Sequence, residues 1–369
     1  MKPVSIASAR SLLAALTLMA AAIAQPVLAQ AYPNKPVRMV IAFGPGGIAD
    51  TIGRLVGQKL SDRFGQSVVG DNRPGAGGAL AARIVAGATP DGYTLLVTTT
   101  AIAVNATAVK DAVDPRTQLI PVAIAATAPT IFVVHRSVTA KTLLDYVRTT
   151  KKGRFVYGTA GVGTTEHLTS EYLFKAVPGL EPTHVPYQGG AAPVTAVVAQ
   201  QVDLATTTTP TASNFIRQGT LRVMAVASHK RLPALPDAPT LAEAGFADFE
   251  NASWIAFFAP AKTPAAVATT LNAEINNALR QADVKDRLTA LGFDIQTRSQ
   301  PEFAEYVKTE VAKWVQVIKA TGITPNWVME QSDGPGRRRR IDLPAAPVLP
   351  FAPIRASGGY RHARTTSVE

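Results

Sequence analysis

The stretch VRMVIAFGPGGIAD, residues 37–50, contains the two signals that indicate the fold. Residues 37–43 are mostly apolar, as expected of a buried strand, and a glycine-rich turn follows at once. Beyond the turn, apolar residues recur at helical spacing: Ile52, Leu55, Val56 and Leu60. A strand that leads through a short turn into a helix is the building unit of an α/β sheet.

This unit recurs along the chain. The sequence predicts strands at 37–43, 67–69, 94–98, 131–134, 155–158, 183–187, 203–207, 221–227 and 254–259. It predicts helices at 50–64, 79–86, 143–149, 165–176, 192–198, 264–281, 283–291 and 301–321. Alternation of short apolar strands with helices favours an α/β fold with a parallel, doubly wound sheet.

The ends of the chain differ from its body. Residues 1–29 combine Lys2 and Arg10, an apolar run at 12–23 and a small residue at Ala29, which is typical of a secretory signal cleaved near Ala29. The apolar run is shorter than the ~20 residues that a membrane-spanning helix needs. Residues 327–369 carry an arginine run and regularly spaced prolines without helical or strand periodicity, so we expect a disordered tail there.

Residues 30–326 are too many for one ordinary hydrophobic core. We therefore expect two lobes, each with a doubly wound sheet: lobe 1 from 30–128 and 250–326, and lobe 2 from 129–249. The chain has no cysteine, which excludes thiol catalysis and cysteine metal sites. Its net charge of +11 falls to about +6 over 30–326, and that part lacks the basic stripe expected of a nucleic-acid-binding protein.

Two glycine-rich loops, each placed between a strand and a helix, are the main candidates for binding. The first is Phe43–Asp50, where the helix that begins near Asp50 offers free N–H groups and a positive dipole end to an anion. The second is Gly158–Leu168, in which Thr164 or Thr165 can cap a helix or donate a hydroxyl.

One alternative for the first loop is a dinucleotide site. Gly44, Gly46 and Ala49 match the nucleotide fingerprint, and Asp71 follows about 20 residues later. Against this, Pro45 removes one loop N–H, and nicotinamide cofactors are not normally available to an exported protein. An exported dinucleotide-dependent enzyme remains the alternative function at this stage.

Catalytic and metal patterns are sparse. The chain has neither the Gly-x-Ser-x-Gly elbow nor the His-Glu-x-x-His motif, and its five histidines lack metal-ligand spacing. His167, in the first turn of the helix after the second loop, could help to close a site or could simply pack there. If its imidazolium form aids binding, affinity should decline as pH rises through about 6.5.

The sequence resembles the periplasmic solute receptors of tripartite tricarboxylate transporters, also called Bug receptors. The resemblance rests on short motifs in family order from Tyr32 to about Pro325: Tyr32-Pro33-x-Lys35-Pro36, Gly46-Gly47-x-x-Asp50, residues 72–78 (NRPGAGG), residues 90–96 (PDGYTLL), Gly163-Thr164-Thr165-x-His167-Leu168, Val185-Pro186-Tyr187-x-Gly189-Gly190 and Pro239-Thr240-x-x-Glu243-Ala244-Gly245.

This resemblance implies a two-lobed Venus-flytrap protein that holds a small carboxylate between its lobes and passes it to membrane permease subunits. It implies a periplasmic monomer without catalysis, cofactor or metal, and sequence alone does not separate transport from ligand sensing. The implied ligand-binding residues are Phe43, Gly46, Gly47, Asp50, Gly161, Gly163, Thr164, Thr165, His167, Tyr187 and Gly189. The sequence departs from the family's usual residues at Gly44-Pro45, Ile48 and Thr206–Thr209. These departures leave the class of ligand unchanged, but the resemblance does not identify which acid is bound.

Overall fold

The structure is a computed structural model that describes residues 32–109, 111–246 and 249–321. The expected signal at 1–29 and the expected tail at 327–369 lie outside these residues. Within them, no helix is both long and apolar enough to cross a membrane.

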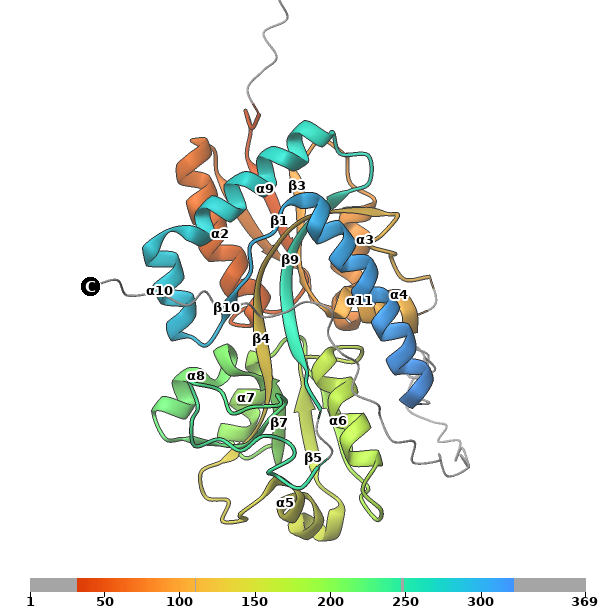
Figure 1. The fold of residues 1–369 in the computed structure, drawn as a ribbon, viewed down its shortest axis with the longest axis vertical. Helices are drawn as coiled ribbons and strands as arrows, with labels where there is room; N and C mark the ends of the chain where they lie inside the picture. The colour runs from red at the N-terminus through yellow and green to blue at the C-terminus, as the bar shows by residue number, and fades with distance from the viewer. Residues whose placement is uncertain (1–31, 110, 247–248, 322–369) are drawn as a thin grey trace, which may run out of the picture. The chain divides into compact units, whose positions relative to one another are not determined.

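Ten strands form one continuous sheet with two halves (Figure 1). The first half contains β1 (Val37–Ile41), β2 (Val68–Asn72), β3 (Thr94–Thr99), β9 (Ala252–Pro260) and β10 (Asp294–Ile295). The second half contains β5 (Val156–Thr159), β6 (Thr183–Pro186), β7 (Leu204–Thr208) and β8 (Leu221–Val226). The strand order is β2-β1-β3-β9-β4-β7-β5-β6, and β8 and β10 also pair with β4.

The long strand β4 (Leu119–His135) belongs to both halves. Residues from Leu119 to Pro129 pair with β9, whereas Thr130–Val133 pair with β7 and Ile131–His135 pair with β8. Figure 1 shows β4 and β9 running side by side between the two halves. The chain therefore changes its pairing partner between Pro129 and Thr130.

The expectation of a parallel sheet is correct only for part of each half. β1 is parallel to β2 and β3, and β5 is parallel to β6 and β7. However, β3–β9, β9–β4, β4–β7 and β4–β8 are antiparallel pairs. The reason is that β4 and β9 carry the chain across from one half to the other and back, so they run in opposite directions.

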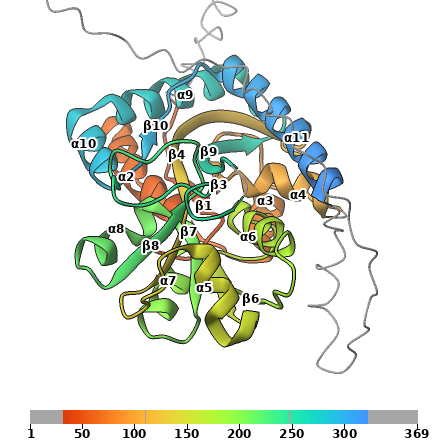
Figure 2. The ribbon, with the colours of Figure 1, turned by 60° about the horizontal axis from the view of Figure 1, so that its bottom comes forward.

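Helices cover both faces of each half. Beside the first half, α2 (Ile48–Phe64), α9 (Ala265–Arg280) and α10 (Ala282–Ala290) lie on one side, and α3 (Ala79–Ala86), α4 (Ala101–Ala108) and α11 (Gln300–Thr321) on the other (Figure 2). Beside the second half lie α5 (Leu143–Thr149), α6 (Thr165–Lys175), α7 (Ala191–Val198) and α8 (Thr209–Arg217).

Alternate residues of β4 show why the second half needs helices on both faces. Phe132 and Val134 join a core with α5 and α6, whereas Ile131 and Val133 join a separate core with α7 and α8. Successive side chains of a strand point to opposite faces, so one apolar run supplies both cores. The doubly wound arrangement expected from the sequence is confirmed here.

Candidate ligand-binding site

The site lies where helices follow the carboxyl ends of parallel strands. β1 leads into α2, β5 into α6, β6 into α7 and β7 into α8. In open α/β sheets, ligands bind in the crevice outside these strand ends. The fold therefore brings several helix N-termini to one place.

A cavity is found there, with about 330 Å³ of space that includes some open solvent. Four of its lining residues are the N-cap residues of four different helices: Gly47 for α2, Thr164 for α6, Gly190 for α7 and Thr208 for α8. No side chain caps α2, α7 or α8. Uncapped first-turn N–H groups and the positive ends of four helix dipoles make this cavity suitable for an anion.

Hydroxyl groups supply the other polar lining. Thr99, Thr207, Thr208 and Thr211 line the cavity, and the Thr208 and Thr211 hydroxyls hydrogen-bond to each other at 2.9 Å. The Thr207 Oγ1 is buried without a hydrogen-bond partner. A buried hydroxyl left without a partner is costly, so it is ready to bond with a ligand or a water molecule.

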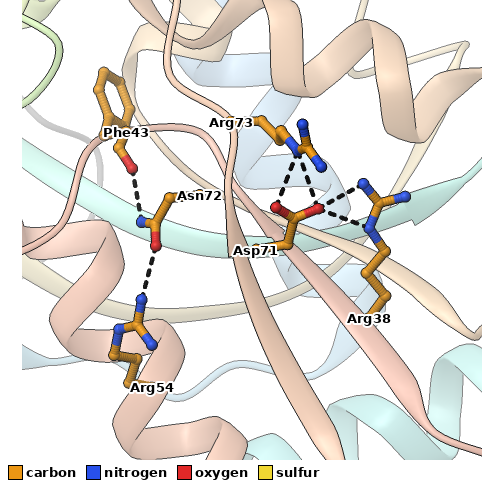
Figure 3. A network of polar contacts seen from close by, with 6 residues as sticks. All are labelled: Arg38, Phe43, Arg54, Asp71, Asn72 and Arg73. Atoms are coloured by element: carbon orange, nitrogen blue, oxygen red, sulfur yellow. Dashed lines mark hydrogen bonds and ion pairs between the residues drawn. The ribbon is translucent and has the colours of Figure 1, made fainter.

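The loop between β1 and α2 is held by Asp50. One carboxylate oxygen of Asp50 accepts from the Gly46 N–H at 3.0 Å, and the other accepts from Arg54 Nε at 2.8 Å and Asn72 Nδ2 at 2.9 Å. Asn72 Nδ2 also donates to the Phe43 carbonyl at 2.9 Å (Figure 3). Asp50 is buried and fully engaged with protein donors, so it shapes the loop.

The loop between β5 and α6 is held by Thr164. The Thr164 hydroxyl donates to the Gly161 carbonyl at 2.8 Å and accepts from the His167 N–H at 3.3 Å. The Gly163 N–H donates to His167 Nδ1 at 3.4 Å. The hydroxyl of Thr165 instead donates to Glu166 Oε2 at 3.2 Å.

His167 is a packed histidine here. Its ring stacks on that of His184 with the centroids 4.2 Å apart, and Thr159 Oγ1 lies 2.7 Å from His184 Nε2. Burial lowers the pKa of His167 to about 4 and that of His184 to about 3. The imidazolium form considered from the sequence is therefore disfavoured, because burial penalises the charged ring.

Loops of the two halves meet across the cleft: the β1–α2 loop contacts the β6–α7 loop, and the β5–α6 loop contacts the segment after β2. The Gly44 N–H donates to the Gln188 carbonyl at 2.6 Å, and a Cβ built on Gly77 would lie 2.2 Å from the Val162 carbonyl oxygen. Gly77 has a φ of +58°, a left-handed conformation that glycine adopts without penalty. Such close backbone approaches mean that the cleft is closed.

The sequence-predicted residues divide into two groups. Phe43, Gly47 and Thr164 line the cavity itself. Gly46, Asp50, Gly161, Gly163 and His167 hold the two loops, and Thr165 contacts Glu166. Gly189 and Tyr187 lie at the loop contact, since a Cβ on Gly189 would be 3.0 Å from the Gly44 nitrogen and the Tyr187 carbonyl faces Gly161.

Sequence reasoning missed the rest of the lining. The missed residues are Ile48, Ala49, Thr99, Ala160, Glu166, Gly190, Thr207, Thr208 and Thr211. Several of them lie in stretches that the sequence had singled out without naming them as ligand contacts: the two glycine-rich loops contain Ile48, Ala49, Ala160 and Glu166, the stretch Thr206–Thr209 contains Thr207 and Thr208, and Gly190 ends a quoted motif. Thr99 and Thr211 carried no such signal, and the helix that contains Thr211 was not predicted.

The contacts of Asp71 argue against the dinucleotide site considered from the sequence. Asp71, which would have to bind a ribose hydroxyl, instead pairs with Arg38 at 2.6 Å and Arg73 at 2.9 Å (Figure 3). Hydrogen bonds from Arg38, with help from Arg73, lower the pKa of Asp71. Among the described residues, no group of three or more side chains is placed to hold a metal ion.

A second hollow, with about 260 Å³ of space that includes open solvent, lies between α6 and α11 and is lined by Leu168, Thr169, Tyr172, Phe249, Trp314, Val317 and Ile318. Its lining is mostly apolar and includes no helix N-cap residue, so it lacks the converging helix N-termini of the first cavity.

Comparisons with known proteins identify the family of this chain. The family model described as "Tripartite tricarboxylate transporter family receptor" matches residues 52–323. Protein BugT of Bordetella pertussis is 30% identical over 307 residues, covering 82% of this chain and 94% of BugT.

Two solved structures from Rhodopseudomonas palustris are also similar. One, a protein with adipate, is 33% identical with a TM-score of 0.74, covering 79% of this chain and 99% of that one. The other, MatC with bound malate, is 30% identical with a TM-score of 0.73, and the match covers 78% of this chain and 100% of MatC. The chain belongs to the tripartite tricarboxylate transporter receptor family, a family of two-lobed periplasmic solute-binding proteins that includes the Bug proteins.

Proposed function

We propose that this protein captures a small organic acid between two lobes and delivers it to the membrane permease subunits of a tripartite transporter. The observation that carries the proposal is a cavity lined by four helix N-cap residues, with three of these helices lacking a side-chain cap. A carboxylate placed there would accept from free N–H groups and from threonine hydroxyls.

The two lobes are proposed with the bounds expected from the sequence, 30–128 with 250–326 for lobe 1 and 129–249 for lobe 2. The pairing of β4 supports this division, because its partner changes between Pro129 and Thr130. Rotation about this junction would separate Gly44 from Gln188 and open the cavity. The protein acts as an exported periplasmic monomer, with its signal cleaved near Ala29, and performs no covalent chemistry.

The ligand class is supported by relatives. Similar structures at 30% identity or more hold malate and adipate, both small dicarboxylates. An unpaired anion inside a closed cleft is unfavourable, but charge-assisted hydrogen bonds and helix dipoles offset that cost.

A thermal-shift screen of the mature chain, from Gln30, with small mono- and dicarboxylates tests the binding step. A ligand present at 100 times its Kd should add about 2.7 kcal/mol to the free energy of unfolding. A panel in which only neutral sugars or nucleotides stabilise the protein would contradict the proposal.

Delivery is tested separately. Cells that carry the permease subunits should take up the bound acid only when this protein is present in the periplasm. Equal uptake without it would contradict the transport role and leave ligand capture intact.

A further inference from the structure

Glu166 is the one acidic residue that lines the cavity, and the function proposed above does not use it. It is the second residue of α6, directly after Thr165. Its exposed fraction is 6%, so it is largely removed from solvent.

The described residues leave the charge of Glu166 unpaired. Its contacts are the Thr165 hydroxyl, at 3.2 Å from Oε2, its own backbone N–H and the neighbouring Thr164. No lysine, arginine or histidine among them forms an ion pair with it. Burial accordingly raises the pKa of this carboxyl group.

The cavity therefore has two different polar regions. N-caps of α2, α7 and α8 at Gly47, Gly190 and Thr208 provide an anion site. Glu166, at α6, already brings a carboxyl group to the fourth helix N-terminus. An ionised Glu166 would repel a second carboxylate from a ligand at this position, whereas a cation would pair with a buried acid that has no charged partner.

Thr207 is an independent indication of a ligand group. Its hydroxyl is buried, lines the same cavity and has no partner, so an additional polar atom fits there. A ligand that only filled the anion site would leave this hydroxyl without a hydrogen-bond partner and Glu166 without a charged partner.

We propose that Glu166 is a specificity-determining residue that selects organic acids carrying a protonated amino group over the same acids without one. This inference rests on the proposed function, because it assumes that the cavity binds organic acids. The acid group of the ligand occupies the N-termini of α2, α7 and α8, and its ammonium group pairs with Glu166.

Calorimetry with matched pairs tests the proposal: succinate with aspartate, glutarate with glutamate, adipate with 2-aminoadipate, and butyrate with 4-aminobutyrate. For any pair that binds, we expect the amino acid to bind about tenfold or more tightly, as a charge-assisted hydrogen bond predicts. Glu166→Gln keeps the shape of the side chain and should abolish that preference.

Glu171→Gln is the matched control. Glu171 lies on the same helix but outside the cavity lining, where it accepts from the Tyr157 hydroxyl and pairs with Lys175. It should change stability and leave the ligand preference unchanged. If Glu166→Gln does not fold, the wild-type protein alone still tests the proposal, because equal affinities for the acid and its amino partner would overturn it.

The outcomes separate the two proposals. Amino-free acids that bind as well as their amino partners, or a preference that survives Glu166→Gln, would overturn the role of Glu166 while ligand capture stands. If none of the acids binds to the wild-type protein and other small acids also fail, both proposals are wrong.

Discussion

At the scale of single residues, Asp50 shows how a binding loop can depend on a residue that need not touch the ligand. Its carboxylate accepts three hydrogen bonds, from Gly46, Arg54 and Asn72. Because both carboxylate oxygens are used inside the protein, we expect Asp50→Ala to lower the free energy of unfolding and the affinity for ligand together.

The conservative variant Asp50→Asn places an amide donor among these donors. Losing one charged hydrogen bond should lower the free energy of unfolding by about 1.5–3 kcal/mol and weaken ligand binding as the loop loosens. Urea denaturation and calorimetry measure the two effects. Asp62→Asn is the control, since exposed Asp62 accepts only from Gln58 on the same helix. Unchanged stability in Asp50→Asn would refute this role.

His167 predicts a pH effect on stability. Burial lowers its pKa to about 4, whereas an unfolded histidine titrates near 6.5. Between these values the unfolded chain binds more protons, so the free energy of unfolding falls as pH falls from 6.5 towards 4. One histidine contributes a slope of up to about 1.4 kcal/mol per pH unit.

Urea unfolding at pH 7, 6 and 5 measures that slope. His167→Gln should reduce it, because the variant has no ring to take up a proton on unfolding. Identical slopes in His167→Gln and the wild type would show that the ring is not held neutral. Ligand affinity should not change between pH 6 and 8 on account of His167, since its ring is neutral throughout.

At the scale of elements, two threonine caps can be compared, one at the cavity and one outside its lining. Thr164 caps α6 at the cavity, and Thr142 caps α5 far along the chain from it, accepting from Asp145 N at 3.1 Å. Removing a threonine cap costs about 1 kcal/mol. Both Thr164→Val and Thr142→Val should therefore be destabilising.

Only Thr164→Val should also weaken binding, by about tenfold, because it loosens the loop that Gly161 and Thr164 form together. Calorimetry on both variants, with stability measured in parallel, makes the comparison. Equal affinities in the two variants would mean that the α6 N-terminus does not contribute to the site. Thr165→Val, by contrast, acts only through Glu166 and should have the smaller effect.

The sequence predicted elements well where apolar periodicity was clean. Helix α3 was predicted with the observed bounds, and β1 and α2 within two residues. Helix α4 was missed because AIAVNATA is buried on almost every side and so has no polar face to create a period. Only the end of β4 was predicted, since alanine and proline in its first part are poor strand formers and β9 supplies the pairing.

At the scale of the whole molecule, closure depends on close backbone contact. A Cβ on Gly44 would lie 2.8 Å from the Gln188 carbonyl oxygen, which belongs to the opposite side of the cleft. Gly44→Ala should therefore disfavour the closed state while each half keeps its own core. We expect about tenfold weaker binding or more, with a larger radius of gyration in small-angle scattering at saturating ligand.

Gly87→Ala is the matched control, because its new Cβ would meet nothing closer than 3.5 Å and it lies at the end of α3. It should bind and close like the wild type. If Gly44→Ala also closes fully and binds with unchanged affinity, the observed loop contact is not part of closure.

The convergence of four helix N-termini could be predicted only in part. Two glycine-rich loops pointed to α2 and α6, but the caps of α7 and α8 become part of the site only through sheet order, which places β6 and β7 beside β5. Glu166 carried no signal because the sequence does not say which side of a first helical turn faces the cavity. The places of these residues in the site are set by pairing between strands that are far apart in the sequence, and a local sequence pattern does not contain that information.

Binding of an anion at the helix N-termini is tested most directly by calorimetry on the mature chain, with acids compared with their own amides. Malate, adipate, succinate, aspartate and glutamate are each measured beside the fully amidated form, which keeps the skeleton and removes the negative charge. We expect at least one acid to bind with 1:1 stoichiometry and its amide to bind at least tenfold more weakly, because helix N-termini and N–H donors favour an anion. An amide that binds as tightly as its acid would contradict this expectation.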